Sequence, residues 1–183
     1  EAASRIDLVA QLKDISYFDV LYTDFTAIRY QRGLAKAQLI PIIDHTSKLV
    51  AGHALGESAD TDLALQAWKK ALLTLQRLAQ KIEGTIIHHD QDGVFIGHGW
   101  LNQVMIKDKM RISFSLDGAK GNVYMESFNG RFKEENRLLF WEQEDLESLR
   151  KVVKSRLRYY NYVRRHSALD YKSPMNYLKE KDK

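Results

Sequence analysis

Runs of apolar residues predict strands in the first third of the chain. Residues 19–26, DVLYTDFT, alternate between apolar and polar positions and are rich in aromatic and β-branched side chains. Residues 35–44 are mostly apolar, which predicts a strand buried on both faces, although Pro41 favours an edge position or a bulge. A third apolar run covers residues 49–56, and short turns separate the three. We therefore predict an antiparallel meander.

The period changes to that of a helix after residue 60. Apolar side chains recur at helical spacing between residues 63 and 82, and Gly84 stands where a helix commonly ends. Residues 85–90 form a short β-branched run, which predicts a strand that returns parallel to the meander. Residues 97–109 predict a weaker helix, and residues 111–115 another short strand.

The last third of the chain is helical in pattern. A polar loop with glycine covers residues 117–121, a helix is expected to begin near Asn122, and a second helix is expected over residues 143–165. This order of elements predicts an α/β fold with a mixed five-stranded sheet, three antiparallel strands followed by two parallel ones, flanked by helices.

Length and composition limit the class of protein. The chain has 183 residues, of which 44% are hydrophobic, so one domain with an ordinary core is expected. We interpret residues 1–18 as a lead-in segment and residues 19–183 as the core. With no cysteine, disulfides and thiolate metal sites are excluded. No apolar run approaches the length of a membrane span, so we expect a soluble intracellular domain.

Positive charge is concentrated at the C-terminal end. Residues 150–183 contain eleven Lys and Arg but three Asp and Glu, a local charge of +8. Because the whole chain carries +4, residues 1–149 carry −4. This asymmetry suggests a polyanionic partner that contacts one face, and a solvated helix surface is an equally good interpretation.

Three acidic residues are candidates for the chemistry. Asp24 lies in the first predicted strand, Asp90 ends the fourth, and Glu126 lies one turn into the helix after the 117–121 loop. If the first and fourth strands are neighbours, Asp24 and Asp90 end side by side and the helix brings Glu126 over them. Carboxylates so close need a counter-charge, and hard oxygen ligands select Mg²⁺ or Mn²⁺. Two such ions would serve phosphoryl transfer.

The spacing of these acids resembles a known pattern. Asp90 and Glu126 have 35 residues between them, as in the D,D-35-E arrangement of retroviral-type integrases and bacterial insertion-sequence transposases. Further segments resemble that family, in order along the chain: YTDFT (22–26), IIDHTSKLVAGHALG (42–56), HHDQD (88–92), the helix with Asn122, Glu126-Ser127-Phe128 and Phe132-Lys133, and YNYVRRHSALDYKSP (160–174). The resemblance covers roughly residues 18–178.

The resemblance implies a ribonuclease-H-like fold and a DDE enzyme that cleaves and transfers DNA strands. By carry-over, Asp24 would bridge two Mg²⁺ (or Mn²⁺) ions, with Asp90 completing one site and Glu126 the other. Water, and later a DNA 3′-hydroxyl, would attack a phosphodiester in line. DNA, as element ends and target, is the implied partner, and the active form is expected to be a homo-oligomer. The implied location is the bacterial cytoplasm, associated with the chromosome.

Further residues of the resemblance have less certain roles. Asn122, Glu126 and Lys133 share one helical face, where a cation could hold DNA phosphates. Lys120 and Arg131 flank this helix and could contact DNA or be merely solvated. Four predicted DNA contacts follow: Lys133, Lys120, Arg131 and Asn122. Arg164 and His166 are expected to brace the last helix rather than to touch DNA.

Two departures from the family pattern leave alternatives open. Gly121 stands where the family usually has Asp, and Asp92 stands where it usually has Gly. Asp92 also competes with Asp90 as a ligand, although Asp90 keeps the spacing. The alternatives are an inactive remnant that binds DNA without catalysis and a structure-specific nuclease of the same fold.

Overall fold

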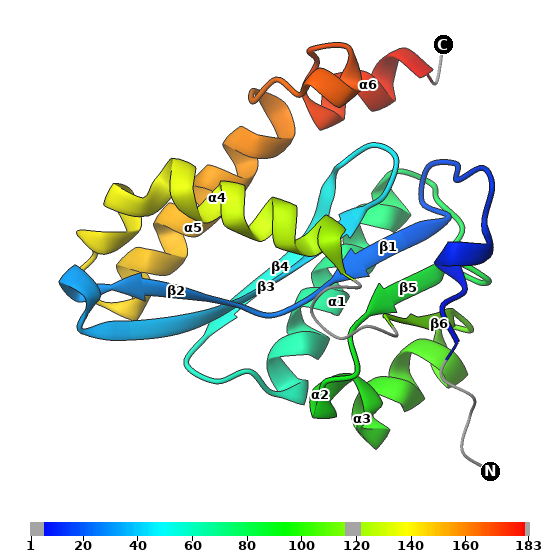
Figure 1. Cartoon of the computed structure of the whole chain (residues 1–183), viewed down its shortest axis with the longest axis horizontal. Coiled ribbons are helices and arrows are strands. Elements are labelled where there is room, and N and C mark those ends of the chain that lie inside the picture. The colour runs from blue at the N-terminus through cyan, green and yellow to red at the C-terminus, as the bar shows by residue number, and fades with distance from the viewer. Residues whose placement is uncertain (1–5, 116–121, 182–183) are drawn as a thin grey trace.

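The computed structural model describes residues 6–115 and 122–181 and has one mixed sheet at its centre (Figure 1). Its strands are β1 (Val20–Thr23), β2 (Thr26–Tyr30), β3 (Ala35–Asp44), β4 (Val50–Gly56), β5 (Ile86–His89) and β6 (Arg111–Phe114). The helices are α1 (Thr61–Arg77), α2 (Gly93–Ile96), α3 (His98–Leu101), a π-helical turn (Asn102–Lys107), α4 (Val123–Trp141), α5 (Leu146–Tyr162) and α6 (Pro174–Lys181). Short 3₁₀ turns cover Val9–Gln11, Gln31–Gly33 and Ser167–Leu169.

The first predicted strand is two strands that run in line along β3. The antiparallel pairs Thr23↔Ile42 and Thr26↔Leu39 follow one register, so Asp24 and Phe25 fill a gap opposite Pro41 and Ile40. The Thr23 hydroxyl donates to the Pro41 carbonyl at 2.9 Å, which places the backbone N of Pro41 on this same side. Proline has no N–H to donate, and the ladder is interrupted there.

Pro41 is not at a sheet edge, which corrects one of the two positions expected for it. β3 is an interior strand, since it pairs with β1 and β2 on one side and with β4 on the other. The other expectation, a bulge, fits better, because the register between β3 and β4 shifts between Ile42 and Ile43. Proline is tolerated in this central strand because its missing donor faces the gap between β1 and β2.

The topology agrees with the expected fold class. β4, β3 and the β1–β2 line are antiparallel, and β5 and then β6 add to β1 in parallel. Across its width the sheet therefore has three antiparallel and two parallel positions, as predicted.

Alternating side chains of the sheet build a core on each face. Leu21, Ile42 and Ile87 pack toward α1, whereas their sequence neighbours, such as Val20 and Ile43, pack toward α4 and α5. Figure 1 shows the same layers, with α4 and α5 on one face of the sheet and α1 on the other. None of the helices in residues 6–115 and 122–181 is long and apolar enough to cross a membrane.

Side chains of α5 occupy the outer edge of β4. The Asn161 amide accepts a hydrogen bond from Val50 N–H at 3.0 Å and donates to the Val50 carbonyl at 2.9 Å. Further along, Arg150 Nε donates to the Leu55 carbonyl at 3.1 Å. Asn161 thereby replaces one residue of a neighbouring strand, which explains the Asn of the YN pair in the C-terminal motif.

Residues 6–9 of the lead-in segment lie against β6. The N–H of Phe114 donates to the Ile6 carbonyl at 3.0 Å, and the N–H of Leu8 donates to Ser113 Oγ at 2.9 Å. The buried ring of His88 also contacts Ser113 Oγ, at 2.9 Å, so this histidine has a packing role.

Several helix boundaries differ from those predicted. α1 ends at Arg77, well before Gly84, which has φ +85° in a turn where its N–H donates to the Lys109 carbonyl. The predicted 97–109 helix is α3 plus the π-helical turn. The predicted 143–165 helix is the shorter α5, which begins at a capping box of Asp145 and Ser148. The 117–121 loop lies outside the described residues.

Gly52 allows α1 to pack directly on β4. A Cβ at Gly52 would lie 2.4 Å from the Ala67 carbonyl oxygen and 2.5 Å from Ala71 N. Gly52→Ala should therefore lower the free energy of unfolding by about 1–3 kcal/mol, measured by urea denaturation. The matched control is Gly130→Ala in α4, where a Cβ meets nothing within 4 Å and helix propensity should raise stability by roughly 0.5–1 kcal/mol. Equal effects of the two changes would contradict this packing account.

Candidate active site

The ends of two parallel neighbouring strands bring Asp24 and Asp90 together. β1 pairs with β5 through Leu21↔Ile87 and Tyr22↔His88. Carried on by two residues, this register places Asp24 level with Asp90, and neighbouring strands lie about 4.8 Å apart. The two aspartates thus lie side by side at the C-terminal ends of the adjacent strands β1 and β5, as the sequence suggested.

Asp24 has the most perturbed carboxyl group of this region. Its pKa is raised to about 7, first by burial and then by the negative charge of Asp90, Asp92 and Glu126. A hydrogen bond from the Phe25 backbone N–H lowers the pKa in part. All three other carboxylates therefore lie close enough to Asp24 to oppose its ionisation.

Asp90 and Asp92 have different local roles. The backbone N–H of Asp92 donates to Asp90 Oδ1 at 3.1 Å. The Asp92 carboxylate accepts from Val94 N–H at 2.9 Å and caps α2, so part of its binding capacity is used within the protein. This difference favours Asp90 over Asp92 as the ligand.

The buried ring of His89 holds the backbone of Asp90. His89 Nδ1 lies 2.8 Å from the Asp90 carbonyl oxygen, which can only accept, so Nδ1 carries the proton. Nε2 accepts from the Trp100 indole N–H at 3.3 Å. The ring is therefore neutral, in agreement with a pKa lowered to about 4 mainly by burial. Asp90 thus directly follows His89, the last residue of β5, whose two ring nitrogens are both hydrogen-bonded.

Asn122 joins the start of α4 to the end of β1. Its side-chain oxygen accepts from Met125 N–H, and its amide donates to the Thr23 carbonyl, both at 3.4 Å. Asn122 is 2% exposed, so its side chain is placed to position α4 and not to contact DNA as predicted. Glu126, one turn further along, is exposed beside the Asp24 region.

The acidic residues suit a divalent cation by chemistry and charge. Asp24, Asp90 and Glu126 supply only hard oxygen donors, and the raised pKa of Asp24 reflects first its burial and then the negative charge of its neighbours. Within residues 6–115 and 122–181, however, no three acidic or histidine side chains are grouped tightly enough to hold an ion. Ion binding would therefore require these side chains to move closer together.

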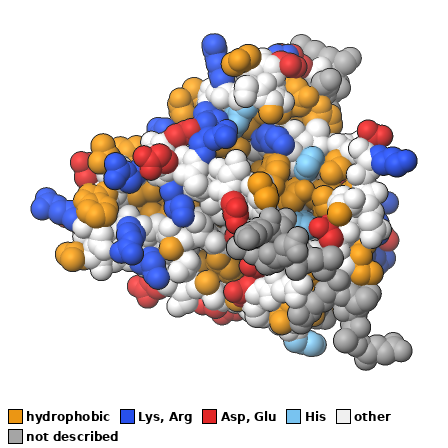
Figure 2. Space-filling view, viewed as in Figure 1, with side chains coloured by type: hydrophobic (Ala, Val, Ile, Leu, Met, Phe, Trp, Pro, Cys, Tyr) orange, Lys and Arg blue, Asp and Glu red, His pale blue; other side chains and the backbone are white. Residues whose placement is uncertain are grey.

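The predicted cations lie further along α4. Lys133 lines a shallow groove of about 350 Å³ between α4 and β2, together with Arg29 and Arg137. Arg131 is exposed and faces a second hollow on the other side of the helix. Lys120 lies outside the described residues. Figure 2 shows Lys and Arg side chains gathered on the face of the molecule that carries α4.

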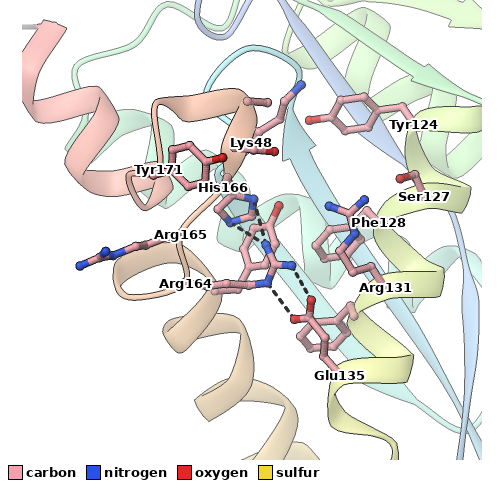
Figure 3. A pocket seen from close by; sticks show the side chains of 14 residues that line it. Lys48, Tyr124, Ser127, Phe128, Arg131, Glu135, Arg164, Arg165, His166 and Tyr171 are labelled. Atoms are coloured by element: carbon pink, nitrogen blue, oxygen red, sulfur yellow. Dashed lines mark hydrogen bonds and ion pairs between the residues drawn. The ribbon is translucent and has the colours of Figure 1, made fainter.

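Arg164 and His166 brace the C-terminal segment, as expected. Arg164 forms two hydrogen bonds with the Glu135 carboxylate of α4, one of them from Nε at 2.8 Å (Figure 3). Its Nη1 lies 3.2 Å from His166 Nδ1, and the His166 ring packs edge-on against Tyr160 at 4.7 Å between centroids. These contacts hold the start of the HSAL segment (166–169) against α4.

Sequence reasoning did not find the two hollows beside α4. Arg29 belongs to β2, which was not predicted as a separate strand, so its position opposite Lys133 was not foreseen. The spacing of Ser127, Arg131 and Glu135 by four residues could have indicated a second functional face of α4. Nothing in the sequence alone indicated what would pack against that face.

Comparisons with known proteins agree with this architecture. Residues 116–174, about a third of the chain, match the family model described as integrase core domain. The HTLV-2 integrase catalytic core domain, solved in complex with magnesium, superposes with a TM-score of 0.62 at 16% identity over 88% of this chain and 96% of that one. The Mos1 transposase catalytic domain, solved with raltegravir and Mg, gives 0.54 at 16% identity over 77% and 71%.

A larger assembly is also similar. A chain of the simian T-cell lymphotropic virus intasome, solved in complex with PP2A regulatory subunit B56 gamma, has a TM-score of 0.64 at 12% identity, over 89% of this chain and 55% of that one. No curated protein matches the chain in sequence. The chain thus has the ribonuclease-H-like fold of integrase and transposase catalytic cores, and the resemblance stated from its sequence is confirmed.

The raised pKa of Asp24 predicts how stability depends on pH. Between about pH 4 and pH 7 the folded protein keeps a proton on Asp24 that the unfolded chain has lost, so this residue makes stability fall as pH rises. Asp24→Asn should therefore raise the free energy of unfolding by about 2–4 kcal/mol at pH 8 and by much less at pH 4. Urea denaturation in EDTA measures both values.

Asp62→Asn, at an exposed position in the first turn of α1, is the matched control and should show no such gain at pH 8. An Asp24→Asn effect that is the same at both pH values would show that the pKa of Asp24 is not raised in the folded protein.

Proposed function

We propose that this chain is the catalytic core of a metal-dependent polynucleotidyl transferase that cleaves DNA strands and joins them to a target, as in transposition or DNA integration. The observation that carries the proposal is that parallel β1 and β5 end with Asp24 level with Asp90, where burial and then the charges of Asp90, Asp92 and Glu126 raise the pKa of Asp24. The match of residues 116–174 to the integrase core domain supports it.

In this proposal Asp24, Asp90 and Glu126 hold two divalent ions, Mg²⁺ or Mn²⁺. When bound, such ions activate the attacking oxygen and stabilise the leaving oxygen of an in-line displacement. The magnesium in the structures of the HTLV-2 and Mos1 catalytic domains supports this choice of cofactor.

The protein residues supply position and charge. Asp24 has to release its proton before it can bind a cation, and because its pKa is raised to about 7, without a cation this release occurs mainly above about pH 7. His89 and Trp100 fix the backbone at Asp90, and Asn122 fixes the start of α4, from which Glu126 projects. Lys133 attracts DNA phosphates without reading sequence.

DNA, as element ends and target, is the proposed partner, and a homo-oligomer is the proposed active form. Strand transfer joins two ends to one target, which a single active site does not accomplish in one event. The HTLV-2 core was solved in dimeric and trimeric forms, and the simian viral protein as an intasome, which supports assembly.

Two observations favour the alternative of an inactive remnant that binds DNA. The described carboxylates are not grouped tightly enough to hold an ion, and Asp92 stands where the family usually has glycine. A remnant would bind DNA but neither cut nor join it, whereas a nuclease of this fold would cut without joining.

A strand-transfer assay distinguishes these functions. With Mg²⁺, the element's own ends and a supercoiled plasmid, the protein should nick the ends and join them to the plasmid. Asp24→Asn, Asp90→Asn and Glu126→Gln should each lower the rate roughly a hundredfold or more, because each removes a cation ligand. Asp62→Asn should leave the rate unchanged. DNA binding without any cleavage by the folded protein would support the remnant instead.

DNA affinity should depend on salt and on Lys133. We expect weak binding whose logarithm falls linearly with the logarithm of salt concentration. Lys133→Gln should weaken binding equally for different sequences and reduce the salt slope by about 1. Fluorescence anisotropy with two unrelated duplexes measures both quantities. Lys69→Gln, exposed on α1 across the sheet, is the control of equal charge, and an equal effect of both changes would exclude a specific phosphate contact at Lys133.

A further inference from the structure

A cavity of about 480 Å³ lies between α4 and the segment 164–171 (Figure 3). Ser127, Phe128 and Arg131 line it from α4, and Arg164, His166 and Tyr171 are among the residues on the opposite side. Ser127 follows Glu126 in α4, so the cavity and the proposed active site share the N-terminal part of this helix.

The lining of this cavity has an excess of positive charge. The one acid among the described residues that line it, Glu135, is engaged through both carboxylate oxygens by Arg164. Lys48 also lines the cavity, where it donates to the His45 carbonyl at 2.7 Å and lies over the Tyr124 ring. Arg165 is directed away from the other side chains in Figure 3.

Arg131 remains available for a ligand. In Figure 3 it projects from α4 into the space between the helix and the opposite segment. Its side chain is exposed and forms no hydrogen bond or ion pair with the residues that the structure describes. A guanidinium in this position can donate two parallel hydrogen bonds to one phosphate.

His166 adds no charge to the cavity, because its ring is neutral. Arg164 Nη1 donates toward its ring, so the facing ring nitrogen accepts and the ring is neutral. Burial, and then the charges of Arg164 and Arg131, lower the pKa of His166 to about 4.

The remaining walls are aromatic. Phe128 and Tyr160 form the buried floor, and the ring of Tyr171 stands at the rim, 71% exposed. Aromatic rings beside a guanidinium are the groups that bind an unstacked base and its phosphate in single-stranded nucleic acid.

We propose that this cavity binds one unstacked nucleotide of a DNA strand, with its phosphate on Arg131 and its base against the aromatic wall near Tyr171. The proposal deepens the proposed function and rests on it for the identity of the strand. The cavity and Glu126 lie on the same helix, α4, so the cavity would hold a strand whose neighbouring nucleotides reach the proposed active site.

Titration of the protein with small ligands tests the cavity directly. Thymidine 5′-monophosphate, thymidine and inorganic phosphate are each followed by NMR chemical-shift changes in EDTA, so that no cation takes part. The nucleotide should shift signals of residues 124–135 and 164–171 and bind about tenfold or more tightly than either thymidine or phosphate. Arg131→Gln should weaken nucleotide binding about tenfold, and Arg131→Lys should restore part of the loss.

Arg77→Gln, exposed on α1 across the sheet, is the control of equal charge and should bind as the unchanged protein does. Nucleotide-induced shifts elsewhere would overturn the proposal, as would equal losses in Arg131→Gln and Arg77→Gln. Phosphate that binds as tightly as the nucleotide would exclude the base contact, and thymidine that binds as tightly would exclude the phosphate contact.

The same proteins in the strand-transfer assay separate the two proposals. Joining of DNA without nucleotide binding in the cavity would refute the cavity proposal and leave the proposed function in place. Nucleotide binding by a protein that never cuts or joins DNA would support the cavity proposal and refute the proposed function.

Discussion

The gathering of carboxylates at the C-terminal ends of β1 and β5 is the constraint on which this site depends. Burial, and then the negative charges of its three acidic neighbours, make the ionisation of Asp24 costly. Such an arrangement is unfavourable for a protein that has only to be stable, because removing any one charge would relieve it. In the proposed function, a divalent cation held by these side chains, where two parallel strands end, would relieve this cost.

Most of the fold was predictable from the sequence because its strands and helices carry strong local patterns. The long apolar run of β3 and the helical period of α1 both appear in the structure close to where they were expected. The break between β1 and β2 was not predictable locally, since it depends on a proline seventeen residues away on the facing strand. The early end of α1 was also missed, because Gly84 has the conformation of a helix end but belongs to a later turn.

Part of the candidate site was also predictable from the strong local patterns of the strands. The register of β1 and β5 brings Asp24 and Asp90 level, which strand order alone suggested. Asn122 was misassigned because spacing on a helix face does not reveal that the side chain caps the helix and is buried. Tertiary contacts such as that between Arg164 and Glu135, 29 residues apart, leave no periodic signal. The cavity that they border therefore became visible only in the folded chain.

The way in which α5 covers β4 has a consequence for how copies of this chain can associate. An uncovered edge strand invites a second molecule to extend the sheet. Here Asn161 and Arg150 already occupy backbone groups of Val50 and Leu55. Extension of the sheet by a second copy of the chain that pairs a strand with β4 is therefore disfavoured. Subunit contacts would instead use the surfaces of helices. A fragment that ends before α5 would expose the same backbone groups and be prone to aggregate.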